Sequence, residues 1–366
     1  MCDVVVIGAG IIGMLSAREL HNAGYSVTIL EQGETARESS WAGGGILSPI
    51  YPWRYPEPIN RLAAWSQKAY PGFCEQLHEQ TGVDSQWIRS GFLMLDVDEH
   101  ERARDWCQDR KIPVANWFGE SLQAREPELS SMFGRAVCMT DVAQVRNPHL
   151  VKALHKSLLD SGIKIREHCP VRHLKIQQAC VTGVETEQGL VTTDKVLVTA
   201  GAWSGELLQH NNLVLPVKPV RGQMLLFKAR PGLLKHILLW EGRYLIPRAD
   251  GRILMGSTVE DVGFSHAVTE QAAHLLCEKA VTMVPALESI EIERHWAGLR
   301  PGSPTGVPYI GPVQGIEGLY LNTGHFRYGV VMGLASARLV AELISGTEPT
   351  MPASDYAPGS LSEQVG

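Results

Sequence analysis

The chain has 366 residues, of which 44% are hydrophobic and 20% charged, and its formal net charge is −6. These values are typical of a soluble globular protein with one large domain or two modest ones. The negative charge disfavours nucleic acid as a partner, and no apolar run approaches the ~20 residues of a membrane-spanning helix.

Cysteine and histidine usage limits the possible sites further. The seven cysteines are scattered, without a C-x-x-C pair, and the thirteen histidines form no metal-binding motif. The cysteine pattern fits reduced thiols in the cytoplasm and argues against a flavin disulfide reductase. We expect a cytoplasmic protein without a metal site.

The N-terminal residues predict a dinucleotide-binding unit. A short β-branched strand leads into Gly8, Gly10 and Gly13, an amphipathic helix follows, and a second strand ends at Glu31. In this G-x-G-x-x-G pattern the glycines permit a tight turn, close approach of a pyrophosphate and close helix packing. The carboxylate is placed to accept hydrogen bonds from ribose hydroxyls.

The following segment bears on which dinucleotide is bound, because the same turn serves NAD and FAD. Residues 36–49 contain Ser39, Ser40 and the glycine run 43–45, which offer hydroxyls and unobstructed backbone amides. These groups suit a pyrophosphate and then the edge of a flavin; the alternative is a flexible surface loop. Trp41 is unexpectedly bulky here, and it either packs against the flavin side or reshapes access.

The middle of the chain alternates between helical and extended patterns. We predict helices at residues 59–80, 98–110, 147–162 and 269–284. Residues 163–204 are predicted to be strands of a sheet that returns to the cofactor. From residue 216 the pattern is strand after strand, with a hairpin signal in RADGR.

The C-terminal region predicts a strand at residues 319–322 and a helix at 329–343. The positive end of this helix could stabilise negative charge on a reduced flavin; otherwise the pair merely closes the sheet. The Pro- and Ser-rich tail, residues 349–366, is expected to be poorly ordered.

Arg300 is unusual because no acidic residue occurs in the surrounding stretch, residues 294–312. An arginine on a stiff Gly/Pro frame without a nearby partner is a candidate anion-binding group. The alternative is a structural arginine paired with an acid distant in sequence.

Five motifs together resemble the glycine oxidase group of the D-amino acid oxidase family: VVVIGAGIIG, VLVTAGAWS, GRYLIPRADGRILMGS, HWAGLRPGSPTGVPYIG and NTGHFRYGVV. The resemblance implies an α/β fold with a Rossmann-like FAD-binding domain and a substrate domain built on an antiparallel β-sheet. The FAD-binding domain is expected at residues 1–84, 141–215 and 297–348, the substrate domain at 85–140 and 216–296, and a tail at 349–366.

The resemblance also implies noncovalent FAD, since no cysteine follows Cys277, which lies within a predicted helix. Together with the motifs above, it gives the following cofactor-binding candidates: Gly8, Gly10, Ile12, Gly13, Glu31, Gln32, Ser39, Ser40, Gly44, Gly45, Ile46, Val171, Gly201, Trp203, His325, Phe326, Arg327, Tyr328, Gly329, Val330 and Val331.

The expected substrate is a small amino acid whose carboxylate is bound bidentately by Arg300. Tyr244 and Arg327 are further substrate-binding candidates, with a packing tyrosine and a structural ion pair as the alternatives. No side chain is expected to act as a base; Arg300 positions the α-carbon, and hydride passes to flavin N5.

The products would be a 2-oxo acid, ammonia or an amine, and hydrogen peroxide. Glycine, sarcosine and small D-amino acids are the expected substrates, and dioxygen is the expected electron acceptor. The family suggests a homo-oligomer, often a tetramer, that supplies glycine imine for thiamine thiazole synthesis. The alternatives are an FAD-dependent D-amino acid dehydrogenase that uses a quinone, an NAD-dependent dehydrogenase, and a flavin-binding sensor or accessory subunit without turnover.

Overall fold

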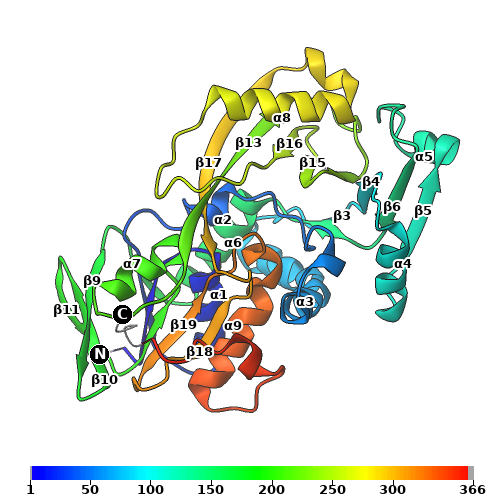
Figure 1. Ribbon diagram of the computed structural model, residues 1–366. Coiled ribbons are helices and arrows are strands. Elements are labelled where there is room, and N and C mark those ends of the chain that lie inside the picture. Colours follow the sequence, from blue (N-terminus) through cyan, green and yellow to red (C-terminus); the bar gives the residue numbers. More distant parts are fainter. Residues whose placement is uncertain (1, 362–366) are drawn as a thin grey trace, which may run out of the picture.

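A computed structural model describes residues 2–361 of the chain (Figure 1). Within these residues the strands form four sheets, of six, three, eight and two strands. The strands of the six-stranded sheet are β1 (Val4–Ile7), β2 (Val27–Leu30), β8 (Lys164–Arg166), β12 (Val196–Val198), β18 (Tyr309–Pro312) and β19 (Leu319–Thr323). Those of the eight-stranded sheet are β4 (Phe92–Leu95), β5 (Val114–Phe118), β6 (Arg135–Met139), β13 (Lys218–Phe227), β14 (Ile237–Trp240), β15 (Arg243–Pro247), β16 (Ile253–Gly256) and β17 (Ile292–Gly302).

The small sheets and the helices complete the fold. The three-stranded sheet consists of β9 (Val171–Gln177), β10 (Cys180–Thr186) and β11 (Gly189–Thr192), and the two-stranded one of β3 (Ile88–Arg89) and β7 (Ala143–Gln144). The helices are α1 (Ile11–Asn22), α2 (Ser39–Ala42), α3 (Glu57–Thr81), α4 (His100–Asp109), α5 (Gly119–Arg125), α6 (Asn147–Asp160), α7 (Ser204–Gln209), α8 (Glu270–Met283) and α9 (Gly329–Ser345). No helix in the described part of the chain is long and apolar enough to span a membrane.

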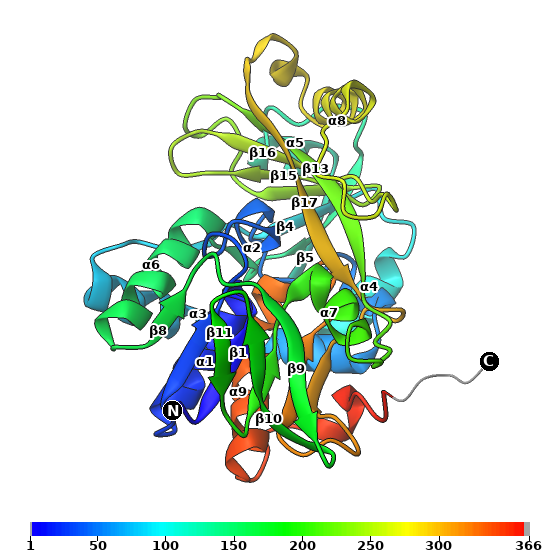
Figure 2. The same cartoon turned by 90° about the vertical axis from the view of Figure 1, so that its left-hand side faces the viewer.

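The six-stranded sheet has the order β18-β19-β12-β1-β2-β8, and only β18 runs antiparallel to its neighbour. Its fully buried strands read as continuous apolar runs because both faces are covered. Alternate residues of β1 pack into two different cores, one shared with α1, α3 and α9 and the other with β9, β10 and α7. Figure 2 shows the three-stranded sheet covering the face opposite the helices.

The eight-stranded sheet stands above the first in Figure 1. Its order is β17-β13-β16-β15-β14-β4-β6-β5, and only the β14–β4 pair is parallel. Helix α8 covers its outer face, while its inner face shares the main core with the helices of the first sheet. The predicted α/β fold with an antiparallel substrate sheet is thus confirmed, apart from that one parallel pair.

Two sequence expectations differ from the structure at the level of elements. The strands predicted between residues 163 and 204 do not form one sheet: β8 and β12 belong to the six-stranded sheet, whereas residues 171–192 form the separate three-stranded sheet, in which β10 pairs with β9 and β11. Strand β17 runs unbroken from Ile292 to Gly302, so it crosses the expected domain boundary between residues 296 and 297.

The C-terminal tail is ordered as far as it is described, which contradicts the expectation for residues 349–361. Met351, Tyr356 and Leu361 are at least 95% buried, and the Tyr356 hydroxyl donates to the carbonyl oxygen of Pro58 at 2.9 Å. The burial of these three side chains stabilises an ordered tail, although the residues between them are rich in Pro and Ser. Residues 362–366 lie outside the described residues.

Replacing Tyr356 by alanine should therefore lower the free energy of unfolding by about 3 kcal/mol, because a fully buried aromatic ring is lost. Urea unfolding measures this value. Tyr356→Phe is the control: it removes only the hydrogen bond to Pro58 and should cost about 1 kcal/mol. An alanine variant as stable as the wild type would mean that the tail does not pack as described.

Candidate functional site

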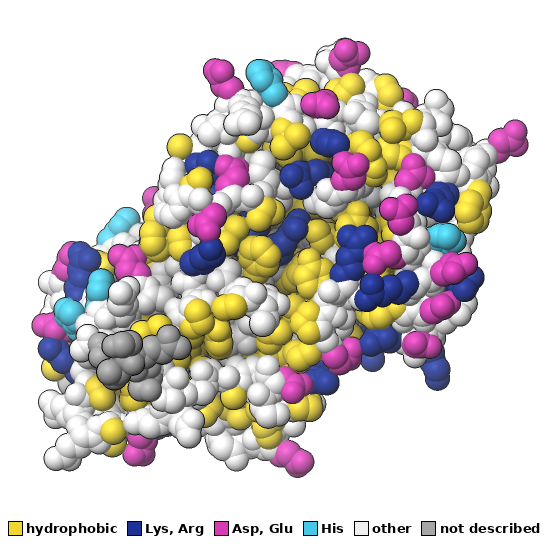
Figure 3. Space-filling view, in the orientation of Figure 1, with side chains coloured by type: hydrophobic (Ala, Val, Ile, Leu, Met, Phe, Trp, Pro, Cys, Tyr) yellow, Lys and Arg dark blue, Asp and Glu magenta, His cyan; other side chains and the backbone are white. Residues whose placement is uncertain are grey.

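A pocket lies between the six-stranded and the eight-stranded sheets. Figure 3 shows this region as a band of hydrophobic side chains bordered by Lys and Arg. All predicted site residues except Gly13 line the pocket. These residues come from segments that are far apart in the sequence: the β1–α1 turn, the residues after β2, the α2 loop, the start of β9, the residues after β12, β15, β17 and the start of α9. Only the family resemblance connected them at the level of the sequence.

The glycine turn after β1 explains why Gly13 is the exception. Gly8 has φ +105°, and a Cβ on it would come within 2.7 Å of the carbonyl oxygen of Thr199. A Cβ on Gly13 would lie 1.9 Å from the carbonyl oxygen of Gly8. Gly13 therefore lies beneath the turn and lets α1 pack against it, while Gly8 and Gly10 form the pocket wall.

Glu31 does more than the sequence predicted. One carboxylate oxygen accepts from the backbone N–H of Ala9 at 2.7 Å, and the other accepts from Gly33 at 2.9 Å. The end of β2 thus braces the glycine turn. The lone pairs that remain on each oxygen are available to ligand hydroxyls.

The segment around α2 is not a flexible surface loop. The hydroxyl of Ser40 accepts from the backbone N–H of Ile11 at 2.8 Å and so caps the start of α1. After α2, Gly44, Gly45 and Ile46 line the pocket, and their amide N–H groups have no hydrogen-bond partner among the described residues. Trp41 does not line the pocket; it makes an edge-to-face contact with Trp296 at 5.7 Å.

The C-terminal wall of the pocket contains unsatisfied polar atoms. Nε2 of His325 and Oδ1 of Asn322 are buried without a partner among the described residues, and both residues line the pocket. Buried polar atoms are normally hydrogen-bonded, so these atoms indicate a ligand. The positive end of α9 begins beside them, at Gly329.

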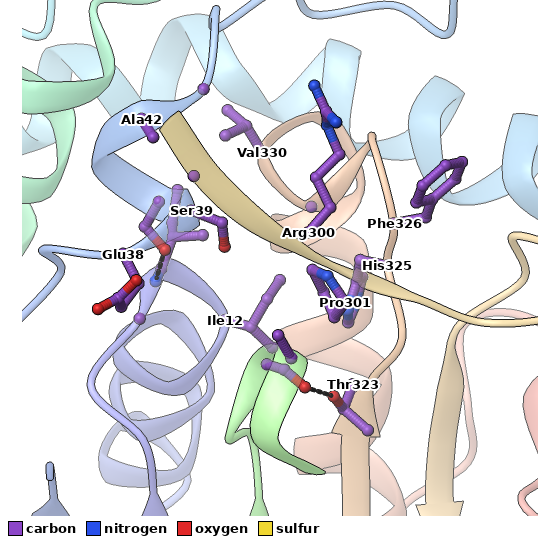
Figure 4. A pocket seen from close by; sticks show the side chains of 18 of the residues that line it. Ile12, Glu38, Ser39, Ala42, Arg300, Pro301, Thr323, His325, Phe326 and Val330 are labelled. Carbon is purple, nitrogen blue, oxygen red and sulfur yellow. Dashed lines mark hydrogen bonds between the residues drawn. The ribbon is translucent and has the colours of Figure 1, made fainter. Parts of the chain in front are cut away.

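Arg300 lies on β17 and points away from His325 and Ile12 (Figure 4). Its Nη2 donates to Oγ of Ser257 at 2.7 Å, and its Nη1 lies 3.2 Å from the carbonyl oxygen of Thr258. Within the described residues it forms no ion pair. Burial lowers the pKa of Arg300 to about 10, so the guanidinium still carries its charge at neutral pH.

The space for this guanidinium comes from a glycine that sequence reasoning missed. A Cβ on Gly222 of the neighbouring strand β13 would lie 2.0 Å from Nη2 of Arg300. Gly222 pairs with Gly298 across the two strands. An isolated glycine inside a strand pattern is a known signal of close approach, and it was available in the sequence VRGQM.

Tyr244 and Arg327 lie at the same end of the pocket. Tyr244 is buried on β15, and its hydroxyl helps to keep the pKa of Arg300 from falling further. Nη2 of Arg327 is 3.5 Å from the carbonyl oxygen of Gly242, and no carboxylate among the described residues pairs with Arg327. The structure thus brings all three substrate-binding candidates to one pocket.

His325 should make the stability of the apoprotein depend on pH. Burial lowers the pKa of His325 to about 3, whereas the unfolded chain protonates a histidine near 6.5. Below pH 6.5 the unfolded state therefore binds a proton that the folded state does not. The free energy of unfolding should fall by up to about 1.4 kcal/mol per pH unit between 6.5 and 3.

Urea unfolding of the apoprotein at pH 7, 6 and 5 tests this expectation against His325→Gln, which lacks the titrating group. The difference in stability between the two proteins should shift in favour of the variant as the pH falls. Equal slopes for both proteins would show that His325 is protonated normally in the folded state.

Comparisons with known proteins agree with this geometry. Residues 3–343 match the profile of the DAO family, described as FAD dependent oxidoreductase. The chain is 48% identical to a glycine oxidase of Pseudomonas aeruginosa and 46% identical to one of Pseudomonas putida, each over 97% of this chain and 98% of the relative. The crystal structure of glycine oxidase from Bacillus cereus superposes with a TM-score of 0.89 at 34% identity, covering 100% of this chain and 99% of that one.

Proposed function

This chain belongs to the DAO family of FAD dependent oxidoreductases, and we propose that it is an oxidase of glycine and other small amino acids. The observation that carries the proposal is the partly buried guanidinium of Arg300, which lines the pocket and has no anionic partner among the described residues. A zwitterion with one carboxylate supplies the missing anion.

The pocket residues fit FAD. Unpaired amides at Gly44, Gly45 and Ile46 are suited to the polar edge of a flavin, and the turn at Gly8 leaves room for a pyrophosphate. The unpaired Nε2 of His325 adds a further hydrogen-bonding partner on the C-terminal wall. FAD supplies the acceptor for the substrate hydride and returns its electrons to dioxygen.

The protein's own part is to bind and orient the substrate. We infer that Arg300 grips the carboxylate with its two terminal nitrogens, that the hydroxyl of Tyr244 donates to the same group, and that Arg327 is a further substrate contact. We infer that no side chain acts as a base; burial lowers the pKa of His325 to about 3, so its imidazole is too weak a base to take up a proton near neutral pH.

The two large sheets support a division into a cofactor-binding unit (residues 1–84, 141–215 and 297–348) and a substrate-binding unit (residues 85–140 and 216–296), except that β17 crosses the boundary at residue 297. The family further suggests noncovalent FAD, a cytoplasmic homotetramer and a role in supplying imine for thiamine thiazole synthesis. None of the seven cysteines lines the pocket, which supports noncovalent binding. Light scattering after size-exclusion chromatography tests the tetramer, and acid precipitation, which releases only unattached flavin, tests noncovalent binding.

The purified protein should be yellow and should release hydrogen peroxide with glycine, sarcosine and D-alanine, with L-alanine as the control. Oxygen uptake must match peroxide release. A flavin that glycine reduces without oxygen uptake would indicate the quinone-dependent dehydrogenase instead. A colourless protein that cannot take up FAD would overturn the proposal.

A further inference from the structure

Arg248 is a buried cation that no prediction assigned to the site. It follows β15 at the start of the hairpin turn, and its residue is 8% exposed. Its guanidinium donates to Oε1 of Gln144 at 2.6 Å and to two backbone carbonyl oxygens, those of Val145 at 3.1 Å and Gly44 at 2.7 Å. No carboxylate among the described residues forms an ion pair with it. Because burying a charge without a counter-ion is costly, this arrangement needs a reason.

The acceptor on Gly44 belongs to the flavin loop, defined here as residues 43–46. A peptide unit is planar and trans, so a carbonyl oxygen and the following N–H point in opposite directions. When Arg248 binds the carbonyl of Gly44 from outside the pocket, the N–H of Gly45 must point the other way. In the same way, the N–H of Val145 donates to the carbonyl oxygen of Gly45 at 2.9 Å. The N–H of Ile46, which belongs to the same peptide unit as that carbonyl, therefore points away from β7.

The packing around the flavin loop leaves no room for side chains at positions 44 and 45. Gly45 has φ +77°, and a Cβ on it would come within 2.1 Å of the carbonyl oxygen of Val145. A Cβ on Gly44 would lie 2.8 Å from Ile246 and 3.2 Å from Tyr244. Residues 244, 246 and 248 lie on the same face of β15 and its extension, because every second side chain of a strand points to the same side. This one face therefore contacts the flavin loop and carries Tyr244.

We propose that Arg248 is a positioning residue: it turns the carbonyl of Gly44 outward, directs the amide N–H of Gly45 into the pocket and couples the flavin loop to the strand that carries Tyr244. Gln144 supports it, since its amide nitrogen donates to the carbonyl of Pro247 at 2.8 Å and keeps its oxygen toward the guanidinium. Although burial lowers the pKa of Arg248 to about 10, the group remains charged at neutral pH.

The test compares Arg248→Met, Arg248→Lys and the control Arg146→Met. Arg146 lies beside the same hairpin and pairs with Asp250 at 2.8 Å, but it makes no hydrogen bond to the flavin loop. FAD is titrated into each apoprotein while its fluorescence quenching is followed, and the visible spectrum of the bound flavin and the thermal unfolding of the apoprotein are recorded.

For Arg248→Met we expect the Kd for FAD to rise at least about tenfold and the flavin absorption bands to shift. With glycine, kcat should fall more than KM rises, because Arg300 is intact. Arg248→Lys keeps the charge but lacks the planar fork that reaches three acceptors, so it should show the same changes in milder form with a near-native apoprotein Tm. Arg146→Met should stay within about twofold of the wild type in every flavin readout.

Wild-type FAD affinity and an unshifted spectrum in Arg248→Met would overturn the proposal. Full restoration of FAD binding by Arg248→Lys would also overturn it, because a cation alone would then suffice. If neither variant folds, Arg248 is a purely structural residue, and the proposal is likewise overturned. The inference rests on the proposed function only for its kinetic readout. A wild type that binds FAD but releases no peroxide would refute the proposed function and leave the flavin readouts valid.

Discussion

Replacing Arg300 by methionine should lower kcat/KM for glycine at least about a hundredfold while the protein still binds FAD. Truncating one partner of a buried, hydrogen-bonded charge pair costs about 2–5 kcal/mol, and 1.4 kcal/mol corresponds to a factor of ten. Ser257 and the carbonyl oxygen of Thr258 accept hydrogen bonds from the guanidinium and hold it in a fixed orientation. If the contact between Arg300 and the carboxylate stabilises the bound substrate as much as the transition state, most of the fall in kcat/KM should appear as a higher KM.

Two further variants separate charge from geometry. Arg300→Lys keeps a cation but not the bidentate fork, and we expect it to recover only part of the activity. Arg294→Met removes an exposed arginine from the same strand, whose guanidinium lies 5.8 Å from the ring centre of Trp41, and it should leave kcat/KM within about twofold. A methionine variant at position 300 with a wild-type KM for glycine would refute the role of Arg300.

The second large effect is expected for Gly13→Ala, which should abolish FAD binding and leave a poorly soluble or unstable protein. The new Cβ would lie 1.9 Å from the carbonyl oxygen of Gly8 and 2.6 Å from Oγ1 of Thr199. Neither atom can withdraw freely, because Thr199 donates to the carbonyl oxygens of both Ile7 and Gly8. Helix α1 would have to move away from the turn that forms the pocket wall.

Gly72→Ala is the matched control. It makes the same substitution in helix α3, where a Cβ meets no atom within 4 Å, so it should stabilise the protein by about 0.5–1 kcal/mol through helix propensity. Flavin content after purification and urea unfolding measure both variants. A Gly13→Ala protein with a full complement of FAD would show that the close packing of α1 is not required.

Several parts of the fold could be predicted because their signals are local. The glycine turn needs particular φ angles within a few residues of one another, and helices such as α6 and α8 have periodicity and boundary residues in adjacent sequence. Helix α8 begins after Thr269, whose hydroxyl accepts from the backbone of Ala272 at 3.3 Å as an N-cap. The predicted helix bounds differ from the structure by one to two residues at most ends.

Other parts could not be read from local patterns. The packing of the tail depends on the hydrogen bond from Tyr356 to the carbonyl oxygen of Pro58, almost 300 residues earlier in the chain. The Pro- and Ser-rich composition of the tail does not predict this contact. The strands from β9 to β11 have the same periodicity as strands of the main sheet. Only their pairing partners, chosen by long-range contacts, place them in a separate layer.

For the candidate site, the sequence by itself determined the chemistry that is present: a phosphate-compatible turn, a terminal helix start, and an arginine without an acidic neighbour. The tertiary structure alone decided that Arg300 is partly buried, that Gly222 makes room for it, and that Arg248 donates to the carbonyl oxygen of Gly44. The physical reason is that burial and hydrogen-bond direction are properties of pairs of strands and loops brought together from distant segments. Residue types along the chain state which groups are available, but not which of their atoms face the pocket.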